Sequence, residues 1–208
     1  MSSKISGPPT FVFLEFLDPE VASLLNGLKD IFSETNKKDR LHITVRGPHY
    51  HLVTEKDINR YAMLLEQEPI LIQSAGMFID DIESVVYIKV SHNNLRKIWD
   101  KPDYPIKDYG FNPHITIYRG TDKGLAQKIY HFLKKEQIAL LCHKFQLTTF
   151  VSKQMNLFQD MSASSRGTFK SLCKMRKIAP DIMERARCLM SQHKKEHTKI
   201  GPARKGPL

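Results

Sequence analysis

The sequence has few cysteines, no zinc-binding spacing and no long apolar run. Its three cysteines among 208 residues, Cys142, Cys173 and Cys188, form no C-x-x-C pair. That argues against a disulfide framework or a zinc knuckle and favours reduced thiols. No stretch approaches the roughly 18 uninterrupted apolar residues of a membrane span, and residues 1–10 lack the apolar centre of a signal peptide. We therefore expect a soluble, non-secreted, cytoplasmic protein, with the nucleus as an alternative because the tail is basic.

The main part of the chain also lacks an excess of charge of either sign. Residues 1–160 carry 20 Lys and Arg against 19 Asp and Glu, whereas residues 161–208 carry 12 against 3. Nearly all of the net charge of +10 therefore belongs to a separable C-terminal segment. Attraction to a polyanion would be a property of that segment, and it does not identify what the rest of the chain does.

The hydrophobic pattern predicts alternating strands and helices over the first 156 residues. The chain is 41% hydrophobic and long enough to bury a core. Its order of elements, β-α-β-α-β-β-α-β-α-β, predicts an α+β fold with two similar lobes. The expected strands are 11–17, 40–46, 70–78, 84–90, 111–119 and about 143–151, with 103–110 as a loop; the expected helices begin at Asp18-Pro19, at a capping box of Thr54 and Asp57, after Ser91 and after Thr121.

The pattern changes at about residue 157, so we expect one domain over 1–156 and a basic, partly helical extension over 157–208. One helix is predicted from 180 to about 192, and residues 201–208 are expected to be disordered. The extension contains a single aromatic residue, Phe169, so contact with a phosphate backbone is more plausible than base stacking. Solvated charge around a packed helix, and a helix that binds another protein or a membrane surface, are the alternatives. The apolar side of this helix would comprise Ile182, Met183, Ala186, Leu189 and Met190.

Two identical His-Ile-Thr triplets stand in strand-like runs, RLHITVRG in the first half of the domain and NPHITIYRG in the second. Side chains of a strand alternate between its two faces. His42 and Thr44 should therefore point the same way, as should His114 and Thr116, while the intervening isoleucines face the apolar side. Each strand is predicted to present an imidazole next to a hydroxyl.

These triplets have an ordinary interpretation and a catalytic one. A single such triplet is close to chance in a chain with nine histidines, and a strand histidine is usually just packed and hydrogen-bonded. Two matched triplets, each followed by an arginine and a glycine, favour catalysis. A neutral imidazole can take a proton, a protonated one can give a proton to a departing oxygen, and the hydroxyls can bond the non-bridging oxygens of a phosphate. Histidine titrates near pH 6.5, so a bell-shaped rate profile is expected.

Over residues 11–151 the sequence resembles the 2H, or two-histidine, phosphoesterase superfamily, which includes RNA cyclic phosphodiesterases also known as 2′-5′ RNA ligases. The resemblance rests on His42-Ile43-Thr44-Val45 and His114-Ile115-Thr116-Ile117, with FNPHITIYRG around the second motif. It implies a bilobal α+β fold in which two antiparallel sheets flank a central groove with helices outside. It implies His42, Thr44, His114 and Thr116 as catalytic residues and no cofactor. The tail after residue 157 has no counterpart in the minimal family domain.

Other residues near the triplets are candidates for substrate binding. Arg46 and Arg119 follow the two motifs, as arginines do in many relatives. Arg46 should alternate onto the face of His42, whereas Arg119 should point away from His114 unless the strand ends or bulges first; solvated strand-end charge is the alternative for both. Tyr118 should share the face of His114 and could stack a base. Phe11, Phe13 and Tyr50 are weaker candidates for the same task, because strand aromatics are more often part of a core. No metal site is expected at His49 or His51, which have no cysteine or acidic partner nearby, and none is expected at His143.

The predicted function is therefore metal-independent hydrolysis of a 2′,3′-cyclic phosphate or of a 2′,5′-linked, linear or cyclic, oligonucleotide. The partner would be an RNA, oligonucleotide or cyclic nucleotide substrate, and we expect a monomer. Two alternatives stay open: an inactive domain that binds RNA ends, and ATP-independent RNA ligation by the reverse reaction. Selectivity for one substrate would reside in loops such as 47–53 and 102–112, whose sequence does not name a base or a linkage.

Overall fold

Two four-stranded antiparallel sheets form the framework of the protein. The computed structural model describes residues 10–33, 41–49, 53–99, 111–153, 157–168 and 181–199. The first sheet has the strand order β2-β1-β7-β8 and the second has the order β5-β4-β3-β6. The elements are β1 (Thr10–Phe16), α1 (Pro19–Phe32), β2 (Ile43–His49), α2 (Glu55–Leu65), β3 (Ile70–Ile79), β4 (Ser84–Ser91), α3 (Leu95–Trp99), β5 (His114–Gly120), α4 (Lys123–Glu136), β6 (Ala139–Cys142), β7 (Lys144–Lys153), β8 (Leu157–Thr168) and α5 (Ile182–Lys199).

The predicted α+β class and its two antiparallel sheets are confirmed, and two strands were missed. β6 is a short edge strand of the second sheet that pairs with β3. β8 has the sequence LFQDMSASSRGT and pairs with β7 along ten positions of the first sheet. Serine and glycine are poor strand formers, so this pairing depends on the neighbouring strand and not on local propensity. The division of the chain at residue 156 remains a prediction.

The helix starts agree with the sequence at some positions and differ at others. The capping box is confirmed: the Asp57 backbone N–H donates to the Thr54 hydroxyl at 3.3 Å, and the Thr54 N–H donates to the Asp57 carboxylate at 3.2 Å. The predicted cap at Thr121 is wrong, because Asp122 stands at the N-cap of α4 and accepts from the Leu125 N–H at 2.8 Å. Before α3, the imidazole of His92, not Ser91, accepts a backbone N–H.

Asp18 joins the start of α1 to the second half of the chain. It occupies the N-cap of α1 with proline at the first turn, as expected, yet its side chain does not cap the helix. The carboxylate instead accepts the backbone N–H groups of His143 and Lys144, the latter at 3.0 Å, between β6 and β7. Asp18 therefore stands at the start of a helix, but its side chain bonds to a segment 126 residues away in the sequence.

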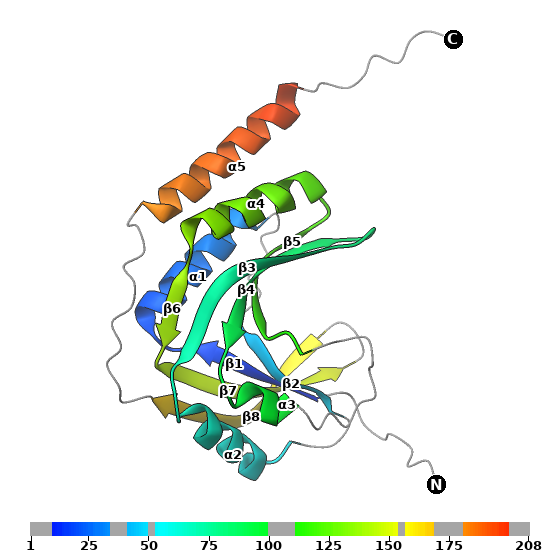
Figure 1. Cartoon of the computed structure of the whole chain (residues 1–208). Helices are drawn as coiled ribbons and strands as arrows, with labels where there is room; N and C mark the ends of the chain where they lie inside the picture. The colour runs from blue at the N-terminus through cyan, green and yellow to red at the C-terminus, as the bar shows by residue number, and fades with distance from the viewer. Residues whose placement is uncertain are drawn as a thin grey trace.

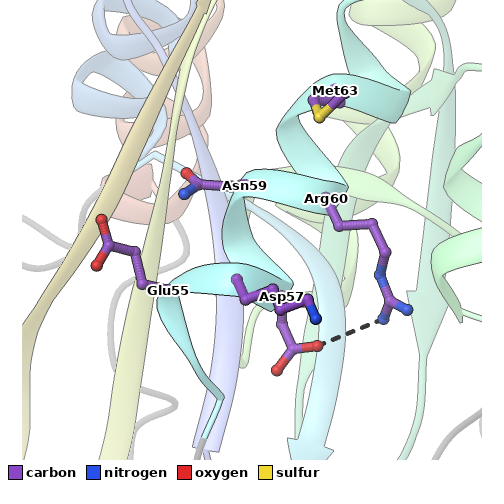
Figure 2. A pocket seen from close by; sticks show the side chains of 6 residues that line it. Glu55, Asp57, Asn59, Arg60 and Met63 are labelled. Atoms are coloured by element: carbon purple, nitrogen blue, oxygen red, sulfur yellow. Dashed lines mark hydrogen bonds and ion pairs between the residues drawn. The ribbon is translucent and has the colours of Figure 1, made fainter.

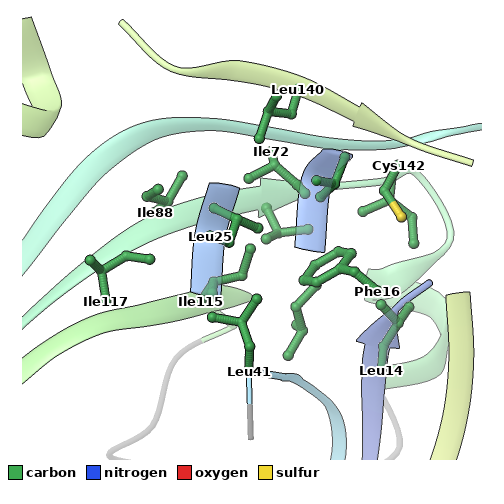
Figure 3. Packing of buried hydrophobic residues seen from close by; sticks show 14 of the residues in the cluster. Leu14, Phe16, Leu25, Leu41, Ile72, Ile88, Ile115, Ile117, Leu140 and Cys142 are labelled. Carbon is green, nitrogen blue, oxygen red and sulfur yellow. The ribbon is translucent and has the colours of Figure 1, made fainter. Parts of the chain in front are cut away.

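A single hydrophobic core joins the two sheets. Val12, Leu14 and Phe16 of β1 and Ile72, Ile88 and Ile115 of the second sheet belong to one cluster of buried side chains with the inner face of α1. Figure 3 shows Leu14 and Phe16 converging with Ile72, Ile88, Ile115 and Leu25. The core therefore takes one face of each sheet. The opposite faces, which carry the histidines of the two triplets, are called the motif faces below.

The C-terminal helix α5 packs on α1 and α4 (Figure 1). Its predicted apolar side is used inside the fold: Ile182 and Ala186 are buried, and Met183, Leu189 and Met190 pack against the core. Polar contacts also join it to α4, since Arg185 pairs with Glu136 and the His193 imidazole lies 2.9 Å from the Asp122 carboxylate. Residues 201–208 and Phe169 lie outside the described residues. No described helix is long and apolar enough to cross a membrane.

Candidate functional site

The two His-Ile-Thr triplets lie on the adjoining edges of the two sheets. His42 immediately precedes β2, which is an edge strand of the first sheet, and His114 opens β5, which is an edge strand of the second. β2 and β5 contact each other, so two segments about 70 residues apart in the sequence adjoin. Thr44 and Thr116 are partly exposed, as are both histidines, while Ile43 and Ile115 are fully buried in the core. The predicted alternation holds within each triplet.

Both motif strands shift register by one residue directly after the threonine. In β2, Phe13 pairs with Thr44 and Val12 pairs with Arg46, which leaves Val45 as the extra residue. In β5, Tyr87 pairs with Thr116 and Val86 pairs with Tyr118, which leaves Ile117 as the extra residue. An extra residue in a strand reverses the alternation of every side chain that follows it. Arg46 of β2, and Tyr118 and Arg119 of β5, therefore lie on the faces opposite to those that simple alternation predicts.

This reversal overturns the expected faces of Arg46 and Tyr118. Arg46 does not share the face of His42: it is 8% exposed, and its guanidinium donates to the Ile98 carbonyl at 3.0 Å beside the ring of Tyr61. Tyr118 does not share the face of His114: it is 1% exposed within the core, and its hydroxyl donates to the Asp122 carbonyl at 3.4 Å. Both side chains support the fold at the ends of the motif strands, and neither lies on a motif face.

The same shift places Arg119 on the motif face of the second sheet. Arg119 pairs with Val85, which lies on the same face of β4 as Tyr87 and therefore on the face of Thr116. The sequence predicted that Arg119 would point away from His114 unless the strand ended or bulged first, and β5 does bulge at Ile117. Its side chain is 63% exposed, and its Nε lies 3.6 Å from a Glu83 carboxylate oxygen. An exposed ion pair of this kind contributes little to stability, so the guanidinium can be redirected to an anion at small cost.

His42 sits in an aromatic cluster on the motif face of the first sheet. The ring of Phe13 stacks on the imidazole with 4.0 Å between centroids, and Phe150 supports Phe13 from the other side at 4.6 Å. Phe13 is 8% exposed, so its contact with the imidazole restricts the orientation of His42. Tyr50 and His51 lie outside the described residues, as do residues 101–110 of the second predicted loop.

His114 has one ring nitrogen held by the backbone. Its Nδ1 lies 2.7 Å from the Asn112 carbonyl oxygen. A carbonyl can only accept, so Nδ1 carries the proton and donates. In the neutral ring the lone pair is then on Nε2, which is the nitrogen that can take up or release a proton. The hydrogen bond fixes both the tautomer and the ring orientation before any substrate binds.

Four further residues surround His114 and were not singled out in the sequence. Tyr87 lies 4.7 Å from the imidazole centroid and Phe78 lies 5.9 Å from it. Asn112 donates its side-chain amide to the Tyr87 hydroxyl at 3.3 Å, and Lys89 pairs directly with His114 across β4 and β5. Alternation along SVVYIKVS puts Tyr87 and Lys89 on one face, but only the register of β4 against β5 shows that this face is the one with His114.

Two other kinds of feature could form a site among the described residues, a metal-binding cluster and a surface hollow on α2. They contain no group of three or more His, Cys, Asp and Glu side chains able to hold a metal ion. A shallow hollow lies along the exposed side of α2, where Asp57 and Arg60 form a local ion pair at 3.5 Å (Figure 2). Its lining residues are Glu55, Lys56, Asp57, Asn59, Arg60 and Met63. They lie on a helix surface and do not form a built site, because none of them is buried and none comes from β2 or β5.

Comparisons with known proteins add little to this geometry. No family model and no curated protein match the chain. Among solved structures, the chain is similar to the structure of Kluyveromyces marxianus Usb1 with uridine monophosphate, at 12% identity, over 79% of this chain and 100% of that chain, with a TM-score of 0.36. At this level of similarity, the function has to be inferred from the residues of the site themselves.

Proposed function

We propose that this protein is a phosphodiesterase that hydrolyses a 2′,3′-cyclic phosphate or a 2′,5′-linked oligonucleotide with His42 and His114 as its proton-transfer groups. The observation that supports it is the placement of both His-Ile-Thr triplets at adjoining sheet edges, each presenting an imidazole and a hydroxyl on a motif face. Two imidazoles and two hydroxyls are a sufficient set for this reaction without a metal ion.

In the proposed reaction a water oxygen attacks phosphorus and the bond from phosphorus to the 2′ or 3′ oxygen breaks. One imidazole takes the proton of the attacking water, and the other, protonated beforehand, gives its proton to the departing oxygen. The net change is the addition of one water molecule. His114 is suited to either part because its Nδ1–H is bonded to Asn112, so that proton exchange takes place at Nε2. Thr44 and Thr116 donate to the non-bridging oxygens, where negative charge builds up.

Of the two arginines predicted to bind the substrate, Arg119 is kept in this proposal and Arg46 is not. It lies on the motif face of His114 and is mostly exposed, whereas the Arg46 guanidinium is bonded to the Ile98 carbonyl. Truncation of Arg119 should therefore raise KM, and truncation of Arg46 should lower stability instead.

The test is turnover of 2′,3′-cyclic nucleotides and 2′,5′-linked dinucleotides in EDTA by the wild type, His42→Ala and His114→Ala. Loss of one proton-transfer group should lower kcat by about 10²- to 10⁴-fold. His131→Ala is the matched control, because His131 is exposed on α4 away from the motif strands. Activity that survives in both histidine variants, or is absent from the wild type on every substrate, would overturn the proposal. Binding without turnover would favour the RNA-end-binding alternative.

A further inference from the structure

A half-exposed aromatic ring stands beside His114 on the motif face of the second sheet. Phe78 of β3 is 47% exposed, and its ring stacks on that of Tyr87 with 4.6 Å between centroids. The same ring and the His114 imidazole are arranged in a T shape with 5.9 Å between centroids. Tyr87 is only 5% exposed, so the pair consists of one covered ring and one ring with surface still open to solvent. A single exposed hydrophobic residue is common on protein surfaces, so what distinguishes Phe78 is its contact with Tyr87 and with the proposed catalytic His114.

The position of Phe78 is built by the residues below and beside it. Gly76 pairs with Tyr87 and has no side chain, which lets the tyrosine ring lie over the strand. Asn112 donates to the Tyr87 hydroxyl at 3.3 Å and so holds that ring from the side of β5. Phe78 pairs with Val85, which pairs in turn with Arg119. The Phe78 ring is therefore held in place by Tyr87, which is itself held by Asn112.

Two cations lie on this face, one opposite His114 and one further along β5. Lys89 of β4 pairs with His114 of β5, and its side chain is exposed. Arg119 lies further along β5, in the same cross-strand row as Phe78. A flat ring next to an imidazole, on a sheet face with two positive charges, complements a molecule that has an aromatic plane close to a phosphate. A nucleotide has that combination.

We propose that Phe78 is a specificity-determining residue, on which the base of a nucleotide substrate stacks while the adjoining phosphate lies at His114. This inference rests on the proposed function and adds to it the residue that would recognise the nucleobase next to the reacting phosphate. Stacking depends on the flat face that every base has, so the site should distinguish nucleotides from base-free phosphodiesters more strongly than one base from another.

The first test compares two five-membered cyclic phosphates, adenosine 2′,3′-cyclic phosphate and glycerol 1,2-cyclic phosphate, which has no base. Phe78→Ala should lower kcat/KM for the adenosine substrate by about 5- to 150-fold, mainly through KM, and leave the glycerol substrate within about 2-fold. Phe78→Trp should restore the adenosine reaction. Ile79→Ala is the matched control, because Ile79 is the next residue of β3, is 39% exposed and alternates onto the other face. An equal loss on both substrates, or no loss, would overturn the role of Phe78.

A second measurement separates failure of this inference from failure of the proposed function. Calorimetry with adenosine 2′-monophosphate and with glycerol 1-phosphate needs no turnover. Tighter binding of the adenosine compound by the wild type and by Ile79→Ala, lost in Phe78→Ala, supports stacking even if no substrate is hydrolysed. Equal affinity of the wild type for both compounds, or a preference that survives in Phe78→Ala, contradicts it. Turnover that depends on both histidines but not on Phe78 would leave the proposed function standing alone.

Discussion

Replacement of Gly76 by alanine tests whether the support beneath the second motif face is as tight as the structure indicates. A Cβ at this position would lie 2.6 Å from the Tyr87 hydroxyl oxygen and closer still to two carbons of its ring. Carbon atoms in contact are ordinarily about 3.5–4.0 Å apart. The tyrosine would have to move by roughly 1 Å, yet Phe78 stacks on it and His114 lies beside it. The substitution therefore affects the stability of the fold and the position of the proposed catalytic imidazole together.

The magnitude follows from two opposing contributions. Overpacking of a filled site costs about 1–3 kcal/mol, and replacing glycine by alanine within a strand returns about 0.5–1 kcal/mol of backbone entropy. A net loss of about 1–2 kcal/mol in the free energy of unfolding is expected for Gly76→Ala. A displacement of about 1 Å at a catalytic group can lower the rate by as much as 100-fold. We therefore expect a marked fall in kcat/KM on a 2′,3′-cyclic nucleotide.

Urea unfolding of Gly76→Ala, Tyr87→Leu and the double variant measures the coupling directly. In the Tyr87→Leu background the obstructing ring is gone, so Gly76→Ala should cost at least about 1 kcal/mol less than in the wild type. Gly27→Ala in α1 is the matched control. Its Cβ would meet only the flexible end of the Met183 side chain, with the sulfur at 3.2 Å, so this variant should be neutral or more stable by about 0.5–1 kcal/mol. The reasoning is refuted if Gly76→Ala unfolds like the wild type and has the same effect in both backgrounds.

Three further predictions concern α5, a buried histidine and the thiols. Ile182→Ala should lower the free energy of unfolding by about 2–4 kcal/mol, because Ile182 is 2% exposed in the core, whereas the exposed Glu184→Ala should not; equal urea midpoints would mean that α5 is a separable appendage. Burial lowers the pKa of His92, so the unfolded chain binds the proton more tightly and stability should fall as pH drops below about 6.5; His92→Gln should flatten that part of a urea midpoint against pH curve, and an unchanged slope would contradict it. Burial raises the pKa of Cys142 to about 12, so peptide mapping after alkylation at pH 8 should find the exposed Cys188 labelled in the folded protein and Cys142 labelled only in urea; early labelling of Cys142 would count against its burial.

The local elements were predictable wherever the signal was local. The capping box of Thr54 and Asp57 needs only residues three apart, and it occurs as expected. Serine-rich β8 was not predictable, because its strand conformation depends on hydrogen bonds to β7. The cap at Asp122 was misplaced by one residue, since threonine and aspartate are both good N-caps and stand next to each other.

In the candidate site, too, the local features were predictable from the sequence and the non-local ones were not. Alternation within a triplet involves three consecutive residues, so the sequence placed His42 with Thr44 and His114 with Thr116 correctly on one side of each strand. It misplaced Arg46 and Tyr118, because a single extra residue after each threonine reverses the faces. Such a bulge is set by pairing with β1 and β4, which no pattern within β2 or β5 reports.

By itself, therefore, the sequence determined the chemical groups: two imidazoles, each with a hydroxyl two residues away, in strands that can present them side by side. The tertiary structure decided which groups surround them. Cross-strand pairing placed Phe78, Tyr87, Lys89 and Arg119, from three different strands, on the face of His114. It placed Arg46 on the opposite, buried face of β2. The physical reason is that side-chain alternation is a local property of one strand, whereas register is set by the hydrogen bonds between strands that are distant in the chain.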